Sequence, residues 1–244
     1  GFRVAFSYMG IFMLITLIPM ALVFKYPQHG WGQQLSSTKR RIYVSSVNFR
    51  PTEMLRTRQW YLIYLSFIIA PTVVLMFGAQ LKMLSKELLI PPEYLSIALV
   101  TFPLANGLSR IIAGFVSDRI GREKTMVIFY TLLGLSTLGL IYLGSTPLLF
   151  VIFVTTASLL GGSPFAFYPS IIGDYYGPKY ATANYGITYT AKAWAGLISG
   201  WLTAYLVELY GTYKIPLLTV AIACFIAAFI VSPIVLKPPK PPRR

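Results

Sequence analysis

The sequence predicts an all-α membrane protein with seven transmembrane helices. Hydrophobic residues make up 56% of its 244 residues, and the mean hydropathy is +0.66, whereas soluble domains contain about 45–50% apolar residues. The apolar residues gather into seven runs. Basic residues are concentrated in some of the connections and sparse in others, which is typical of loops sorted between the two sides of a membrane.

Each apolar run is expected to form one helix, because about 20 residues of helix cross the hydrocarbon core. The expected spans are residues 4–24, 60–81, 95–116, 125–144, 147–172, 182–207 and 214–236. Prolines and glycines interrupt several of them, among them Pro71, Pro103, Gly162 and Pro164. Membrane helices tolerate such residues because neighbouring helices and water satisfy the freed backbone groups. We interpret them either as functional bends or as ordinary packing positions.

The basic residues indicate which connections face the cytoplasm, since cytoplasmic loops are enriched in Lys and Arg. Residues 25–59 form the longest connection and carry seven Lys or Arg against one acid, Glu53. If this linker is cytoplasmic, eight further basic residues lie on the same side: Arg119, Arg122, Lys124, Lys179, Lys237, Lys240, Arg243 and Arg244. The net charge of +14 then reflects topology in the cell membrane. We expect the lipid bilayer, and no nucleic acid, as a partner.

The order of the spans predicts the domain organisation. One span is followed by the basic linker and then by six spans with short connections, as expected from the last helix of one six-helix half followed by a complete second half. We expect residues 1–24 to be that last helix, 25–59 the linker, 60–236 a six-helix bundle and 237–244 a basic cytoplasmic tail. Because the chain begins at Gly1 beside an apolar run, we expect the rest of the N-terminal half to be missing from it.

Residues that carry enzymatic or metal chemistry are sparse. Cys224, the single cysteine, lies in an apolar run, and His29, the single histidine, lies in the polar linker. The spans contain no His/Cys/Asp cluster, nucleophile elbow or phosphate-binding loop. We therefore expect no enzyme, no catalytic residue, no metal and no cofactor.

Two cations, Arg110 and Lys192, lie deep inside apolar spans that contain no acid. A Lys or Arg near the bilayer centre costs about 2.5–3.5 kcal/mol on insertion scales, and neither residue is close enough to a span end to reach water fully. Two such charges imply a compensating partner. A mobile anion is the simplest one, and an acid in the missing N-terminal half is the alternative.

Helical spacing predicts the neighbours of the two cations. Asn106 lies one turn before Arg110, and Thr188 and Tyr189 lie one turn before Lys192, so they share a face or border it. These faces are polar enough to line a water-filled cavity. Arg offers a planar fork for a carboxylate and Lys a mobile point charge, which together suit a small dicarboxylate or alternating monocarboxylates.

A charged loop joins the third and fourth spans and has the spacing G-x-x-x-D-R-x-G-R-x-K. Its residues are Gly114, Asp118, Arg119, Gly121, Arg122 and Lys124. The glycines permit close packing and a tight reversal, and the Asp can accept hydrogen bonds from a nearby Arg at the cytoplasmic mouth. The spacing resembles the signature loop of the major facilitator superfamily, at the place where that family repeats it in its second half. We therefore expect the major facilitator fold and a gating role for this signature loop, residues 114–124.

Further stretches resemble the oxalate:formate antiporter family. Residues Glu53 to Trp60 resemble the entry to its seventh helix, Arg110 with the signature loop its eighth, and the stretch from Asn184 to Lys192 its eleventh. The resemblance covers nearly the whole chain, as helices six to twelve. It implies that Arg110 and Lys192 face the central cavity and bind the carboxylates of the substrate.

The expected tenth helix departs from this pattern. The family carries a Trp and a Tyr in the substrate box where this sequence has Gly161 and Phe165. The loss of the indole and the hydroxyl implies a roomier or differently shaped site and leaves the identity of the anion open. Phe165 and Tyr168 remain candidates for the pathway, although aromatic residues in membrane helices more often serve in packing or at the interface.

The positions of the acids bear on coupling. Proton-coupled symport commonly uses an acid inside the membrane, but the seven acids of this chain fall in loops or at span ends. Asn106 stands where related monocarboxylate:proton symporters carry an Asp. The sequence thus favours a secondary transporter that moves small organic anions by alternating access and exchange. A proton-coupled monocarboxylate symporter, and a non-transporting anion sensor or channel, are the alternatives.

Overall fold

The computed structural model describes residues 1–23, 45 and 47–241. The chain divides into two compact units, residues 1–40 and 41–244. In the first unit the described residues form α1 (Phe2–Val23), an apolar helix of 22 residues. Several expected linker and tail residues lie outside the described part: Lys25, His29, Lys39, Arg40, Arg41, Arg243 and Arg244.

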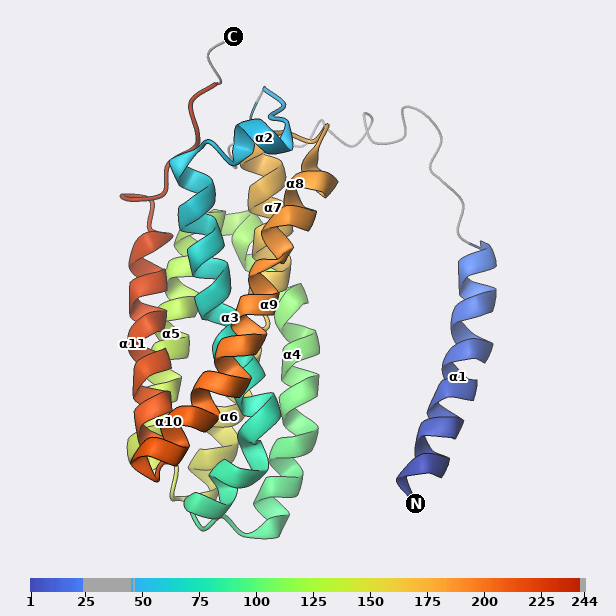
Figure 1. The fold of residues 1–244 in the computed structure, drawn as a ribbon, viewed down its shortest axis with the longest axis vertical. Helices are drawn as coiled ribbons and strands as arrows, with labels where there is room; N and C mark the ends of the chain where they lie inside the picture. Colours follow the sequence, from blue (N-terminus) through green and yellow to red (C-terminus); the bar gives the residue numbers. More distant parts are fainter. Residues whose placement is uncertain (24–44, 46, 242–244) are drawn as a thin grey trace. The chain divides into compact units, whose positions relative to one another are not determined.

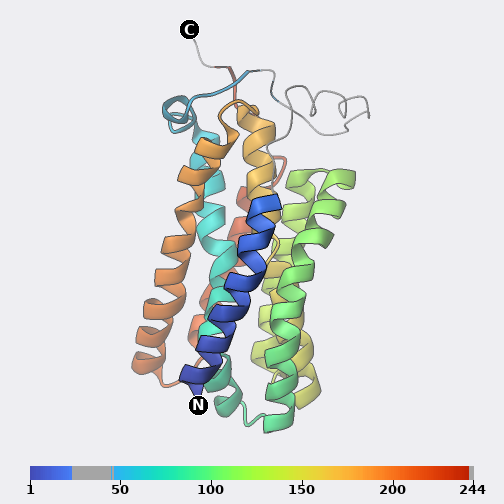
Figure 2. The same cartoon turned by 90° about the vertical axis from the view of Figure 1, so that its right-hand side faces the viewer.

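The second unit is a bundle of helices whose long members lie side by side along one axis (Figures 1 and 2). Its helices are α2 (Pro51–Met54), α3 (Arg58–Glu87), α4 (Pro92–Ile120), α5 (Arg122–Leu143), α6 (Pro147–Gly161), α7 (Pro164–Tyr176), α8 (Ala181–Tyr189), α9 (Ala191–Leu197), the π-helical turn η2 (Ile198–Leu202), α10 (Thr203–Tyr210) and α11 (Lys214–Ile230). The part of the chain that the structure describes contains no strand, in agreement with the predicted all-α class.

Five helical stretches are long and apolar enough to cross a membrane. They are α1, α3, α4, α5 and the stretch Pro147–Tyr176, which comprises α6 and α7. The expected span 182–207 is divided among α8, α9, η2 and α10, and the expected span 214–236 contains α11, an apolar helix of 17 residues. Among the described residues each of the seven predicted runs is helical for most of its length, but three of them, 147–172, 182–207 and 214–236, are interrupted or short.

Some helix boundaries differ from the expected ones, because a helix either continues past its apolar segment or breaks inside it. α3 has 30 residues and α4 has 29, because a helix can continue beyond its apolar segment once side chains such as Lys82 and Lys86 are exposed. The run 147–172 is not one regular helix. The chain turns at Gly162 and Ser163 between α6 and α7, just before Pro164, which has no N–H to continue a helical ladder.

Pairs of helices build the core of the bundle. α5 packs against α11 and α6, α4 packs against α6, and α3 packs against α9 and α11. Large aromatic side chains, including Tyr130, Tyr168 and Phe77, are fully buried between them. Because lipid tails are as apolar as these side chains, close packing and internal hydrogen bonds hold membrane helices together.

The end of the linker is bound to the turn between α7 and α8. The N–H of Ser45 donates to the carbonyl of Asp174 at 2.7 Å, and that of Phe49 donates to the carbonyl of Tyr176 at 2.9 Å. The buried Phe49 ring also packs edge-on against Tyr176. Gly177 lies in this contact at φ 82° and ψ 158°, a conformation that is essentially restricted to glycine. The linker end and the turn therefore form one packed unit.

We expect Gly177→Ala to destabilise the protein by about 1–3 kcal/mol, because a non-glycine residue would be forced into this backbone conformation. In addition, the new Cβ would lie 2.7 Å from a linker carbonyl oxygen. Gly173→Ala, on the same helix, is the matched control, since a Cβ there would meet no atom within 4 Å. Thermal unfolding in detergent measures both variants, and equal melting temperatures would contradict this account of the turn.

Candidate functional site

Arg110 is exposed on α4, a helix with many exposed apolar side chains such as Leu108 and Ile111. Its guanidinium carbon lies 5.4 Å from the centroid of the Phe165 ring. Phe165 is the second residue of α7, directly after the break between α6 and α7. The contact between α4 and α7 therefore brings a cation of one helix against an aromatic ring of the other.

Lys192, which follows Phe165 in the sequence whereas Arg110 precedes it, contacts the same ring. Its Nζ lies 5.2 Å from the Phe165 centroid and donates a hydrogen bond to the Tyr189 hydroxyl at 3.2 Å. The helix is interrupted just before it, because α8 ends at Tyr189 and α9 begins at Ala191. The structure thus brings together four residues that the sequence predicted for the site: Arg110, Lys192, Tyr189 and Phe165.

Neither cation forms an ion pair with an acid among residues 1–23, 45 and 47–241, where both ion pairs belong to Arg122. A cation over an aromatic face gains about 0.5–2 kcal/mol, less than the insertion cost of about 2.5–3.5 kcal/mol for each charge. The contacts with Phe165 therefore offset only part of the free energy that it costs to place Arg110 and Lys192 inside the membrane. The described residues supply no carboxylate that would compensate the rest.

The two rings that contact the cations, Phe165 and Tyr189, belong to an aromatic cluster. We define it as Phe67, Phe165, Tyr185 and Tyr189. Phe67, on α3, has its ring centroid 6.2 Å from Phe165 and 6.1 Å from Tyr189, and both contacts are edge-to-face. Tyr185 lies 5.5 Å from Tyr189. Sequence reasoning missed Phe67, because a phenylalanine inside an apolar span carries no signal that distinguishes a site wall from core packing.

Two candidates from the sequence lie elsewhere. Thr188 is fully buried; its hydroxyl accepts from Trp60 Nε1 at 3.1 Å and donates to the Asn184 carbonyl. Tyr168 is also fully buried, and its hydroxyl bonds to Tyr130 and Ser66. Both side chains therefore point into the bundle, which for Tyr168 agrees with the packing role that the sequence also allowed, while substrate contact by Thr188 stays a prediction.

Asn106 is half-buried on α4 at the break between α6 and α7. A Cβ added to Gly162 would lie 2.8 Å from Asn106 Nδ2, so the glycine permits this close approach. Gly161 faces the interior, where a Cβ would lie 2.8 Å from the Val74 side chain. The missing indole at position 161 therefore does not by itself open space beside the two cations.

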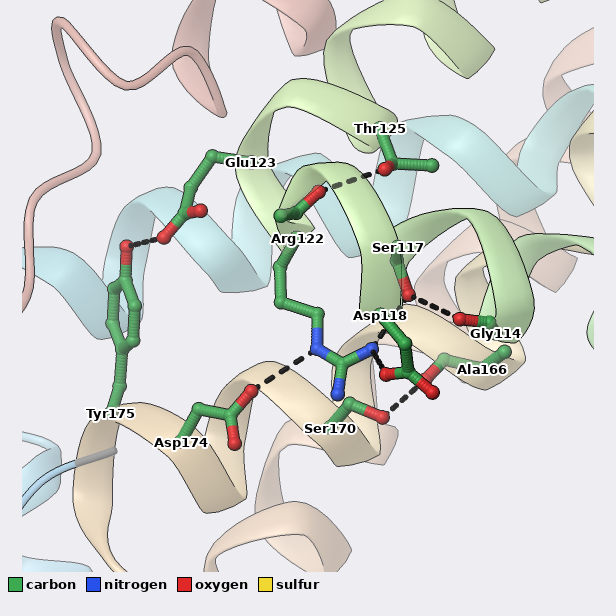
Figure 3. A network of polar contacts seen from close by, with 11 residues as sticks. Gly114, Ser117, Asp118, Arg122, Glu123, Thr125, Ala166, Ser170, Asp174 and Tyr175 are labelled. Atoms are coloured by element: carbon green, nitrogen blue, oxygen red, sulfur yellow. Dashed lines mark hydrogen bonds and ion pairs between the residues drawn. The ribbon is translucent and has the colours of Figure 1, made fainter. Parts of the chain in front are cut away.

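A second cluster centres on Arg122 in the signature loop (Figure 3). Arg122 Nε donates to Asp174 Oδ2 at 3.1 Å, while Nη1 contacts Asp118 Oδ1 at 2.5 Å and Ser117 Oγ at 2.6 Å. The Arg122 side chain is 12% exposed and that of Asp174 is 15% exposed. A planar guanidinium offers donors in several directions at once, so one side chain ties the end of α4 to the end of α7.

Asp174 is a partner that sequence reasoning missed, because it lies 52 positions from Arg122 and its neighbours show no motif. A parallel contact joins the same elements, since the Tyr175 hydroxyl donates to Glu123 Oε1 at 2.5 Å (Figure 3). Both interactions link the signature loop to the end of α7. The same end of α7 accepts the hydrogen bonds of the linker, so the three segments meet there.

The remaining residues of the signature loop differ in their surroundings. Gly121 has φ 99° and ψ 153°, which supports the tight reversal expected at this glycine. A Cβ at Gly114 would meet no atom within 4 Å, so the close packing expected there is absent from the described residues. Arg119 is exposed and lies over the Phe115 ring at 3.8 Å, and Lys124 is exposed. Arg122 is thus the structural centre of the loop.

The described residues contain no group of three or more His, Cys, Asp or Glu side chains that could hold a metal ion. The polar groups near Arg110 and Lys192 are hydroxyls and an amide, which can orient an oxyanion but bring no negative charge of their own. The arrangement is therefore suited to holding an anion.

Residues 63–244 match the model of the Major Facilitator Superfamily. The chain belongs to this superfamily. Membership in the superfamily and the five long apolar helices make it a multi-pass membrane protein with the major facilitator fold. The resemblance that the signature loop predicted is confirmed.

Two relatives extend the comparison of this superfamily member. The "Oxalate:formate antiporter" of Oxalobacter formigenes is 32% identical over 231 residues, which cover 93% of this chain and 53% of that protein. The "Uncharacterized 38 kDa protein in 23S RNA operon" of Thermoproteus tenax is 27% identical over 211 residues, which cover 86% of this chain and 50% of that protein. The chain thus spans about half the length of the curated relatives that it matches.

We expect Arg122→Lys to lower the free energy of unfolding by about 1–2 kcal/mol, because an ammonium cannot keep charged hydrogen bonds in all these directions. Arg119→Lys is the control, since Arg119 is exposed and a Lys preserves its charge over Phe115. Thermal unfolding in low and high salt compares them. The loss should persist in high salt because Asp174 is largely buried and buried pairs are screened little; equal stability of the two variants would refute the central role of Arg122.

Proposed function

We propose that this chain is the C-terminal half, with the helix that precedes it, of a secondary transporter for small organic anions. The single observation that carries the proposal is the pair Arg110 and Lys192, which both contact the Phe165 ring and have no acidic partner among the described residues. A bound anion supplies the charge that these two side chains lack. Membership in the superfamily supports transport over a fixed binding role.

A small carboxylate suits the chemistry of the pair. The guanidinium of Arg110 can hold both oxygens of one carboxylate, and the ammonium of Lys192 attracts a second negative charge or the same group from another side. The Tyr189 hydroxyl, already bonded to Lys192, adds a polar contact. The name of the relative from Oxalobacter formigenes supports carboxylates as the class, whereas Phe165 has no hydroxyl to offer the substrate.

Exchange is the mode of transport that these charges favour. With substrate bound, the two positive charges are neutralised and the protein can change between its two access states; without it, the charged pair resists closure. The α4 residue one turn before Arg110 is Asn106, which cannot carry a proton for symport. The acids of the signature loop and of α7 are engaged with Arg122 or with a tyrosine hydroxyl.

The rest of the transporter is an N-terminal half in the same polypeptide, which closes the cavity over Arg110 and Lys192. We place residues 1–24 as its last helix, 25–59 as a cytoplasmic linker, 60–236 as the six-helix C-terminal half and 237–244 as a cytoplasmic tail. About half of each curated relative lies outside the matched length, which supports this division.

We expect Arg110→Gln and Lys192→Gln, made separately in the full-length polypeptide, to reduce anion uptake into liposomes by at least about tenfold, since one lost charged hydrogen bond is worth about 1.5–3 kcal/mol. Lys82→Gln, which removes an exposed cation elsewhere, should retain uptake. The measurement is uptake of labelled oxalate or formate against an internal pool of either anion. Uptake by the Gln variants at the wild-type level would contradict the proposed site.

The same liposomes separate exchange from the other modes. Exchange requires an internal anion and is indifferent to a proton gradient, whereas a proton symporter accumulates anion when only the outside is acid. A channel shows flux that does not saturate and no counter-transport. Accumulation driven by acid alone, without internal anion, would contradict exchange and leave the anion site in place.

A further inference from the structure

The Phe67 ring occupies the centre of the aromatic cluster, although it touches neither cation. It is fully buried on α3 and stacks on Tyr168 at a centroid distance of 4.0 Å and an interplanar angle of 20°. Its edges contact Phe165 and Tyr189, and Tyr185 lies nearly parallel to it at 6.5 Å. One ring thus contacts four others from two different helices, α7 and α8.

The Tyr168 ring on which Phe67 stacks is anchored by a chain of hydrogen bonds. The Tyr130 hydroxyl donates to the Tyr168 hydroxyl, which donates to Ser66 Oγ, both at 2.9 Å. Ser66 Oγ in turn donates to the carbonyl of Ile63. This buried chain joins α5, α7 and α3, and every hydroxyl in it has a partner, so the Tyr168 ring is held in place at its hydroxyl and, with burial of both rings, restricts the movement of Phe67.

The side of Phe67 towards the cations touches the two rings that position them. Phe165 contacts both Arg110 and Lys192, and Tyr189 contacts Lys192 through its ring and its hydroxyl. Arg and Lys side chains have many rotamers, so their separation depends on the rings against which they rest. Phe67 is the common support of both rings.

We propose that Phe67 is a positioning residue, which sets the separation of Arg110 and Lys192 and thereby the length of the carboxylate that the pair accepts. The inference rests on the proposed function, since it concerns the same anion site. A rigid support favours anions whose charges match one spacing. Loss of the ring lets Phe165 and Tyr189 move, which weakens binding of the preferred anion and reduces the differences in kcat/KM among anions of different length.

The test compares variants of the full-length polypeptide in liposomes, with formate, oxalate, malonate and succinate as probes. Phe67→Leu removes the ring and keeps an apolar side chain; we expect it to raise KM for the preferred anion by about 3- to 10-fold, the value of lost aromatic contacts, and to narrow the differences in kcat/KM between probes. Phe77→Leu is the matched control, because Phe77 is equally buried on the same helix and lies outside the cluster; it should preserve KM and the order of preference.

Two further variants keep the test decisive. Tyr168→Phe retains the stacked ring and removes its hydroxyl, so it should lower stability while the order of preference stays. If Phe67→Leu does not insert as a monodisperse protein, Phe67→Met takes its place with the same expected direction. Identical KM and preference in the Phe67 and Phe77 variants would overturn the inference alone, whereas a wild type that moves none of the four anions would overturn the proposed function and the inference with it.

Discussion

The proposed site depends on two cations, Arg110 and Lys192, that form no ion pair with an acid among the described residues. Arg110 and Lys192 come from helices that are far apart in the sequence, and both rest on Phe165. A neutral ring can hold two cations in place without cancelling the charge of either, which is what the proposed anion site requires. Had an acid occupied this position, the pair would be a structural salt bridge with no demand for substrate.

Breaks in helices bring the site together. Phe165 is the second residue after the break between α6 and α7, and Lys192 is the second residue after the break between α8 and α9. α3 supports the second break through two of its side chains, since Trp60 donates to Thr188 and the Tyr64 hydroxyl bonds to Thr190 at 2.9 Å. A continuous helix would have placed each side chain by helical phase alone.

The sequence predicted what hydropathy, charge and motif spacing encode: the helical class, the signature loop, and Arg110 and Lys192 as candidates. It could not predict which face Thr188 presents, because the interruption at Thr190 alters the helical phase on which that expectation rested. Phe67 and Asp174 could not be predicted for another reason: each acts through a partner that is distant in the sequence. Long-range contacts of this kind leave no periodic trace in a single sequence.

The close contact between the linker end and the turn at Gly177 also constrains how this protein can diverge. Any side chain at position 177 would meet backbone atoms at 47 and 48, and backbone atoms are the same for every residue, so no substitution at 47 or 48 makes room for one. Position 177 is therefore expected to stay glycine among relatives that keep this contact, although no motif connects it to a linker more than a hundred residues away. Such invariance would be the evolutionary record of a linker fastened to the end of α7, the helix that carries Phe165.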